Sequence, residues 1–137
     1  MGQQQLLLIV LSVIIVGIAV VVGINMFSAS SASANLEAVT NDLLNLASRA
    51  QQYYVKPTGL GGGGNSFVGL SADAPGLQKL TPRASNDNGT FSVSAAGTAT
   101  SVTLQGVGNQ DGDGDGTNCT IQITVFSDSL STTVVNR

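Results

Sequence analysis

Residues 6–24 read LLLIVLSVIIVGIAVVVGI, and the first charged side chain that follows is that of Glu37. In an α-helix these residues extend about 30 Å, which matches the hydrocarbon thickness of a bilayer. A helix that is apolar on every side has no face suited to water, so it belongs in lipid or inside a protein assembly. The remaining sequence is small and polar, and we do not expect it to bury this segment within one subunit.

Composition limits the classes of function that the chain can have. Its 137 residues suffice for one small domain beside the apolar segment, and the net charge is −3 with 9% charged residues. This balance argues against a basic surface for nucleic acid. The absence of histidine excludes Ser-His-Asp and Cys-His catalysis, and the single Cys119 cannot form an intramolecular disulfide. We therefore predict that the chain is not an enzyme.

A second helical pattern follows the apolar segment. Apolar residues recur every three or four positions, with polar and charged residues between them, so we predict a half-buried amphipathic helix. The apolar stripe consists of Leu36, Val39, Leu43, Leu46, Ala50 and Tyr53. Pro57 and the glycine-rich run at 59–64 end the helix, and a flexible connection is favoured over a phosphate-binding loop there because no strand precedes the run.

The last third of the chain alternates apolar and polar residues with a period of two, which predicts short antiparallel strands. Such a sheet has one apolar face, and the stripe of the amphipathic helix is the one cover that we identify for it. The sequence thus predicts an α+β fold, a long N-terminal helix on about four antiparallel strands. We divide the chain into an apolar helix (1–27), an amphipathic helix (28–56), a helix-to-sheet loop (57–89) and the sheet (90–137).

One cluster has the character of a ligand site. Asp111, Asp113 and Asp115 alternate with glycines, as in the first half of an EF-hand loop, where carboxylates converge on calcium. The second half of that motif is missing, because Gln122 stands where a bidentate Glu is required. Two interpretations stay open, a calcium site completed by other oxygens and a solvated acidic hairpin loop.

The N-terminal segment admits several interpretations. A cleaved secretory signal is disfavoured because the apolar run is long and no Lys or Arg precedes it. A simple membrane anchor fits the length and hydrophobicity. A phage coat-type subunit fits the apolar helix but does not explain the large C-terminal domain.

The fourth interpretation rests on a resemblance. The chain starts with Met1-Gly2-Gln3-Gln4-Gln5 and continues directly into the apolar run. This start resembles the mature type IV pilins and pseudopilins, which have a few uncharged residues, a Glu at the fifth position and then an apolar helix. The resemblance covers about the first fifty residues, and beyond them only the architecture. It implies that the following residues mediate subunit assembly: Met1, Gln5, Leu6, Leu7, Leu8, Ile9, Val10, Leu11, Val13 and Ile14.

The sequence departs from the pilin pattern in two places. No leader ending in Gly precedes Met1, and the Met-Gly start favours numbering that begins at a mature subunit. Gln5 stands at the position of the Glu, and an amide is easier to desolvate than an unpaired carboxylate. We hypothesise an uncharged polar ladder of Gln3, Gln4 and Gln5 between subunits. Gly17 and Gly23 are the expected weak point if the helix unwinds in a filament, and a continuous helix is the alternative.

The resemblance implies a structural subunit of an extracellular helical filament, a homopolymer that serves adhesion, motility, DNA uptake or secretion. It also implies an inner-membrane precursor pool and partners in a pilus assembly machinery. Two alternatives stay open, a monomeric membrane-anchored extracytoplasmic binding domain and a minor pseudopilin of a secretion apparatus.

Overall fold

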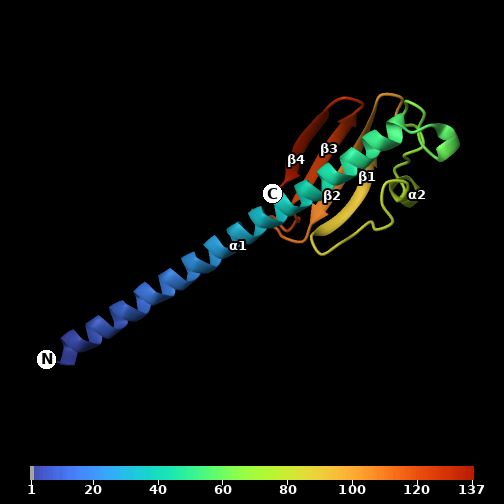
Figure 1. Cartoon of the computed structure of the whole chain (residues 1–137). Coiled ribbons are helices and arrows are strands. Elements are labelled where there is room, and N and C mark those ends of the chain that lie inside the picture. The colour runs from blue at the N-terminus through green and yellow to red at the C-terminus, as the bar shows by residue number, and fades with distance from the viewer. Residues whose placement is uncertain (1) are drawn as a thin grey trace.

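The helix α1 (Gly2–Val55) runs without interruption through the apolar and the amphipathic segments. The computed structural model describes residues 2–137 and has the predicted α+β fold, a long N-terminal helix packed on a four-stranded antiparallel sheet (Figure 1). The strands, which lie side by side in chain order, are β1 (Gly89–Ala95), β2 (Ser101–Gly108), β3 (Thr120–Phe126) and β4 (Leu130–Asn136).

The second half of α1 contributes the predicted stripe to the core. Its buried residues recur at helical spacing and face β2 and β3, the two central strands. They are Val39, Leu43, Leu46, Ala47, Ala50 and Tyr53, whereas Ala32 is buried beside Gly112. Leu36 is half-buried and packs against this cluster. The period of the apolar residues therefore predicts which face of the helix is covered.

The sheet shows the predicted alternation on its central strands. On β2, Val102 and Leu104 are buried, whereas Ser101 and Thr103 are partly exposed. Cys119 precedes β3 and is buried beside that face, as a small hydrophobic residue would be. Gly106 on β2 stands directly under α1, because a Cβ there would lie 2.6 Å from a methyl carbon of Val39. The absent side chain therefore allows the helix and the sheet to approach closely.

The helix-to-sheet segment is more ordered than a flexible connection. After the 3₁₀ turn η1 (Thr58–Leu60), the amides of Gly63 and Gly64 donate to the carbonyls of Tyr53 and Lys56. These bonds satisfy carbonyls at the end of α1 that have no partner within the helix. A short helix, α2 (Ala74–Gln78), then packs on β1.

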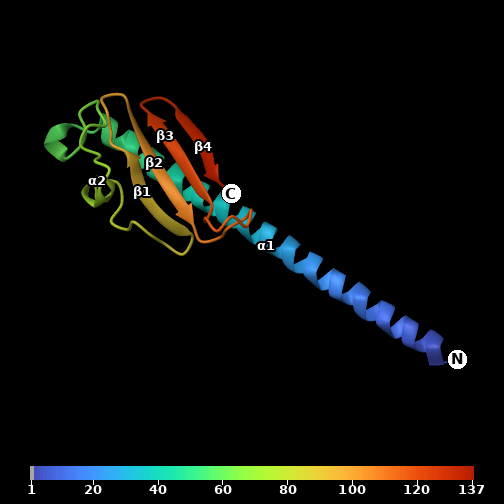
Figure 2. The same ribbon diagram turned by 180° about the vertical axis from the view of Figure 1, so that it is seen from behind.

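The prediction that α1 alone covers the sheet is wrong in one respect. Four apolar side chains of the segment 65–82 are buried in the same core, and the segment covers the side of the sheet near β1. These residues are Phe67, Leu70, Leu77 and Leu80. At the other edge, Leu130 and Val134 of β4 stay exposed because α1 packs on β2 and β3 (Figure 2). The core is therefore displaced towards β1.

Candidate assembly surface

The first half of α1 extends away from the domain as a bare helix (Figure 1). Every residue from Gly2 to Ser30 is exposed, and Ala32 is the first buried side chain that the structure describes. We call residues 2–31 the bare segment. It is long and apolar enough to cross a membrane, and none of its most apolar 18-residue window is buried. Such a segment needs lipid or other protein around it.

The run 6–24 within the bare segment is apolar on all sides. The consecutive residues Leu6, Leu7, Leu8 and Ile9 point in directions about 100° apart and are each more than half exposed. The hydroxyl of Ser12 donates to the carbonyl of Leu8 at 2.7 Å, so this polar group is satisfied within the helix. The surface therefore suits contact with apolar neighbours from several directions rather than a single flat interface.

The structure places the residues predicted for assembly as follows. Gln5 and the apolar residues from Leu6 to Ile14 lie exposed on the bare segment, and Gln3 and Gln4 lie beside Gln5. The role predicted for Met1 lies outside the described residues. The helix is continuous through Gly17 and Gly23, and a Cβ at either glycine would meet open space. Unwinding at these glycines concerns an assembled state and stays a prediction.

Asn35 joins α1 to the domain at the point where the helix first meets the sheet. Its amide nitrogen donates to the carbonyl of Asn88 at 2.8 Å, and its side-chain oxygen accepts from the amide of Asn109 at 2.9 Å. The thiol of Cys119 also donates to this oxygen, at 3.3 Å. A single side chain thus bridges the loops before β1 and after β2. The sequence carried no signal for this role, because Asn35 lies in a run of small polar residues.

The acidic residues Asp111, Asp113 and Asp115 do converge. One oxygen from each lies within 4.8 Å of the others, so the three could serve as ligands of one cation. The loop is also held by its own bonds. The two carboxylate oxygens of Asp111 accept from the amides of Gly114 and Gly116, each at 2.7 Å, and Asp115 accepts from the side chain of Asn136. Calcium binding stays a prediction.

These bonds separate the pKa values of the three carboxyl groups. The amide of Gly116 and then that of Gly114 lower the pKa of Asp111, and the Asn136 side chain lowers that of Asp115. For Asp113 the amide of Asp115 acts to lower the pKa, but desolvation and the neighbouring carboxyl groups outweigh it and raise the pKa. Asp113 is therefore the carboxyl group in this loop that takes up a proton first.

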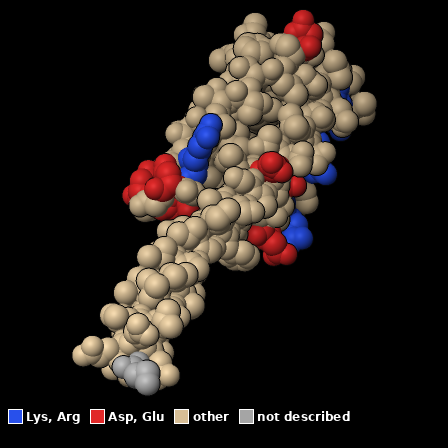
Figure 3. Space-filling view, turned by 90° about the vertical axis from the view of Figure 1, so that its left-hand side faces the viewer, with Lys and Arg blue, Asp and Glu red and all other residues tan. Residues whose placement is uncertain are grey.

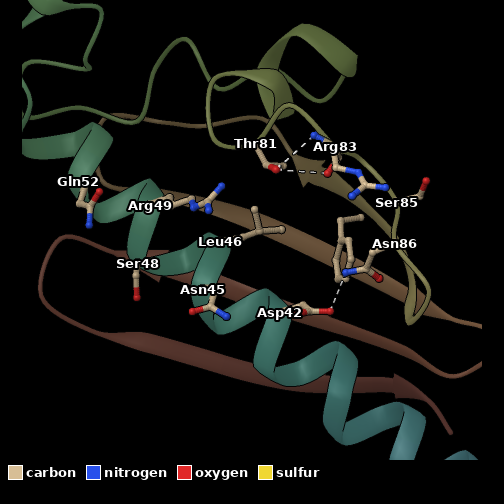
Figure 4. Close-up of a pocket in the computed structure, with 11 residues that line it drawn as sticks. Asp42, Asn45, Leu46, Ser48, Arg49, Gln52, Thr81, Arg83, Ser85 and Asn86 are labelled. Carbon is tan, nitrogen blue, oxygen red and sulfur yellow. Dashed lines mark hydrogen bonds between the residues drawn. The ribbon is translucent and has the colours of Figure 1, made fainter.

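A groove of about 580 Å³ lies between α1 and the segment that leads into β1. Figure 4 shows Arg49 on α1 and Arg83 on the segment opposite it, both in the lining of this groove. The Asp42 carboxylate on the same wall accepts hydrogen bonds from the side chains of Asn86 and Asn88. No pattern in the sequence indicated this groove, because its two walls are 29 or more residues apart along the chain.

Comparison of the chain with models of protein families, with curated proteins and with solved structures finds no match. The fold and the bare segment are therefore the observations on which a function can be proposed.

Proposed function

We propose that this chain is a type IV pilin-like structural subunit of a helical filament, assembled through the bare segment of α1. The observation that carries the proposal is the division of one continuous helix into a packed half and a bare half. The bare half is uncharged and is dominated by the apolar run 6–24, and in this proposal it lies in the membrane before assembly and among copies of itself in the filament.

Transfer of this helix from lipid into a filament requires a protein neighbour that packs closely against it. Moving apolar side chains from lipid to protein brings little hydrophobic gain, because lipid is equally apolar. Association then depends on close packing and on polar contacts between helices. Close packing is favoured by the small residues Gly17, Ala19 and Gly23. Polar contacts are available from the side-chain amides of Gln3, Gln4 and Gln5.

An exchange of the apolar sequence tests the proposal. Residues 6–24 are replaced by an apolar helix of equal length made of Leu and Ala, and the control is the unmodified chain expressed at the same level. We expect the variant to stay in the membrane fraction and to form no filaments, because a generic apolar helix preserves insertion but not specific packing. Normal filaments from the variant would contradict the proposal. A native chain found only as single membrane copies would favour the alternative, an anchored binding domain.

Gln5 provides a narrower test of the polar ladder. We expect Gln5→Leu to reduce the yield of sheared filaments several-fold, because the substitution removes the Gln5 amide and leaves its partner in the neighbouring subunit without a hydrogen bond. Membrane insertion should be unaffected or improved. Gln5→Asn retains the amide and serves as the matched control. If Gln5→Leu assembles as well as the native chain, the ladder does not exist, whereas the subunit role could still hold.

A further inference from the structure

Positive charge is concentrated along the packed half of α1, beside residues 42–56. Two adjoining grooves there share Arg49 and Gln52 in their walls. Together their walls include four of the five Lys and Arg residues of the chain, namely Arg49, Lys56, Lys79 and Arg83. With the Asp42 carboxylate, this described lining carries a formal charge of +3, although the net charge of the chain is −3.

Two of these positive groups donate hydrogen bonds to neutral carbonyl groups. The guanidinium of Arg49 donates to the carbonyl of Leu80 at 3.1 Å, and the ammonium of Lys79 donates to the carbonyl of Gly69 at 2.7 Å. Asp73 is near Lys79, but its carboxylate accepts from the hydroxyl of Ser71. We call this surface the cationic groove, and its charge attracts an anionic partner.

Negative charge is concentrated closer to the bare segment, near Ala32. The acidic loop, residues 111–116, carries three exposed or half-exposed carboxylates. It lies beside the point on α1 where the bare segment ends and the packed half begins (Figure 3). A Cβ on Gly112 would lie 3.0 Å from that of Ala32, and the amide of Gly112 donates to the carbonyl of Arg137. The loop is therefore attached to the edge of the sheet that β4 forms.

The two charged surfaces cannot meet within one molecule. Ala32 and Arg49 are 17 positions apart on α1, which separates the loop from Arg49, a residue shared by both grooves, by about 25 Å along the helix axis. They also lie towards opposite edges of the sheet, since the loop bonds to the end of β4 and the groove is bordered by the segment before β1. A parallel second copy, displaced by about 25 Å along α1, would bring its acidic loop level with the groove of the first.

We propose that the acidic loop of one copy docks in the cationic groove of a neighbouring copy, and that this contact sets the axial offset between subunits. The inference rests on the proposed filament function. A contact between two different patches is heterologous, so repeating it produces an open helical polymer rather than a closed dimer. Exposed charge pairs contribute mainly register and partner choice, and the bare segments supply the main packing.

Site-directed cross-linking tests the contact in assembled filaments. The full-length double variant Arg83→Cys, Asp113→Cys retains Arg49 and two of the three carboxylates, and its native Cys119 is buried. Treatment with a short bismaleimide should convert subunits into a ladder of dimers, trimers and higher multimers. Each single-cysteine variant should give no multimers beyond dimers. A matched control pairs Arg83→Cys with Asp128→Cys, which also replaces an exposed aspartate but lies at the turn between β3 and β4, and should give no ladder.

Filaments that form normally but show no ladder in the Arg83–Asp113 variant would overturn the docking contact and leave the subunit role intact. Absence of filaments from the native chain would overturn the subunit role and the contact with it. A charge exchange supplies a second readout. Asp113→Arg should reduce filament yield at low salt several-fold, and combination with Arg83→Asp should restore it. An equal loss in the single and the combined variants would also overturn the contact.

Discussion

The two halves of α1 have the same backbone conformation and opposite surroundings. In the half that begins at Ala32, one stripe of apolar side chains is buried against the sheet, and polar residues occupy the other face. In the run 6–24 of the bare segment every side is apolar and every side is exposed. Fold stability therefore comes from one half, and the other half offers a surface that must be covered by something outside the subunit.

Truncation of one leucine in each half should give the largest difference. Leu43 is 1% exposed and Leu11 is 53% exposed. We expect Leu43→Ala to lower the free energy of unfolding of the domain by about 2–5 kcal/mol, because it leaves a cavity between α1 and the sheet. Leu11→Ala, the matched control, should leave this free energy unchanged. Denaturant unfolding of the full chain in detergent checks both variants, and equal losses would show that the halves are not independent.

A pair of glycines sharpens the same comparison. Gly106→Ala should destabilise the domain by about 1–3 kcal/mol, because its Cβ would collide with Val39 and force α1 away from the sheet. Gly17→Ala meets open space and should increase the stability of the bare helix by about 1 kcal/mol. The same unfolding measurement, with helical content from circular dichroism, tests the pair. A neutral Gly106→Ala would mean that the helix and the sheet are not in close contact there.

Asparagines provide a third pair at the boundary between the halves. Asn35→Ala should cost about 1–2 kcal/mol of domain stability, because it removes bonds to the carbonyl of Asn88 and the amide of Asn109. Asn25→Ala lies on the bare segment and should have no effect on the domain. Faster hydrogen exchange at Asn109 in Asn35→Ala alone would support the bridge. Unchanged exchange would argue that Asn35 does not hold the loop.

Acidification should have the smallest effect, and it acts on the exposed acidic loop. The pKa values of Asp111 and Asp115 are lowered, so their stabilising bonds are complete above the ordinary pKa of 3.8 and are lost as the pH falls through the lower folded values. The pKa of Asp113 is raised, so its contribution has the opposite sign and disappears as the pH rises through the folded value. Carboxyl chemical shifts should show that Asp113 has the highest titration midpoint of the three. A higher midpoint for Asp111 than for Asp113 would contradict this.

Local patterns in the sequence predict the regular elements well. The period of the apolar residues predicts the packed stripe from Val39 to Tyr53, and the alternation after Thr90 predicts the strands. The uniform run 6–24 also predicts the exposed apolar helix. These features depend on neighbours within a few positions, and for that reason periodicity detects them.

Features that depend on irregular segments were not predictable. The packing of Phe67 and Leu77 into the core and the groove between Arg49 and Arg83 are set by the path of the segment 57–88. The convergence of Asp111, Asp113 and Asp115 was suggested by their spacing, whereas the bond from Asn136 to Asp115 was not. Long-range pairing of this kind has no periodic signature in the sequence.

Electron microscopy of material sheared from the cell surface, followed by helical reconstruction, shows whether the chain is a filament subunit. We expect thin filaments in which residues 2–31 form the central bundle, the sheets lie outside, and Gln5 contacts a neighbouring helix. A reconstruction in which the bare segments do not contact one another would contradict this expectation. So would a native chain that is recovered entirely as single copies in detergent extracts of the membrane.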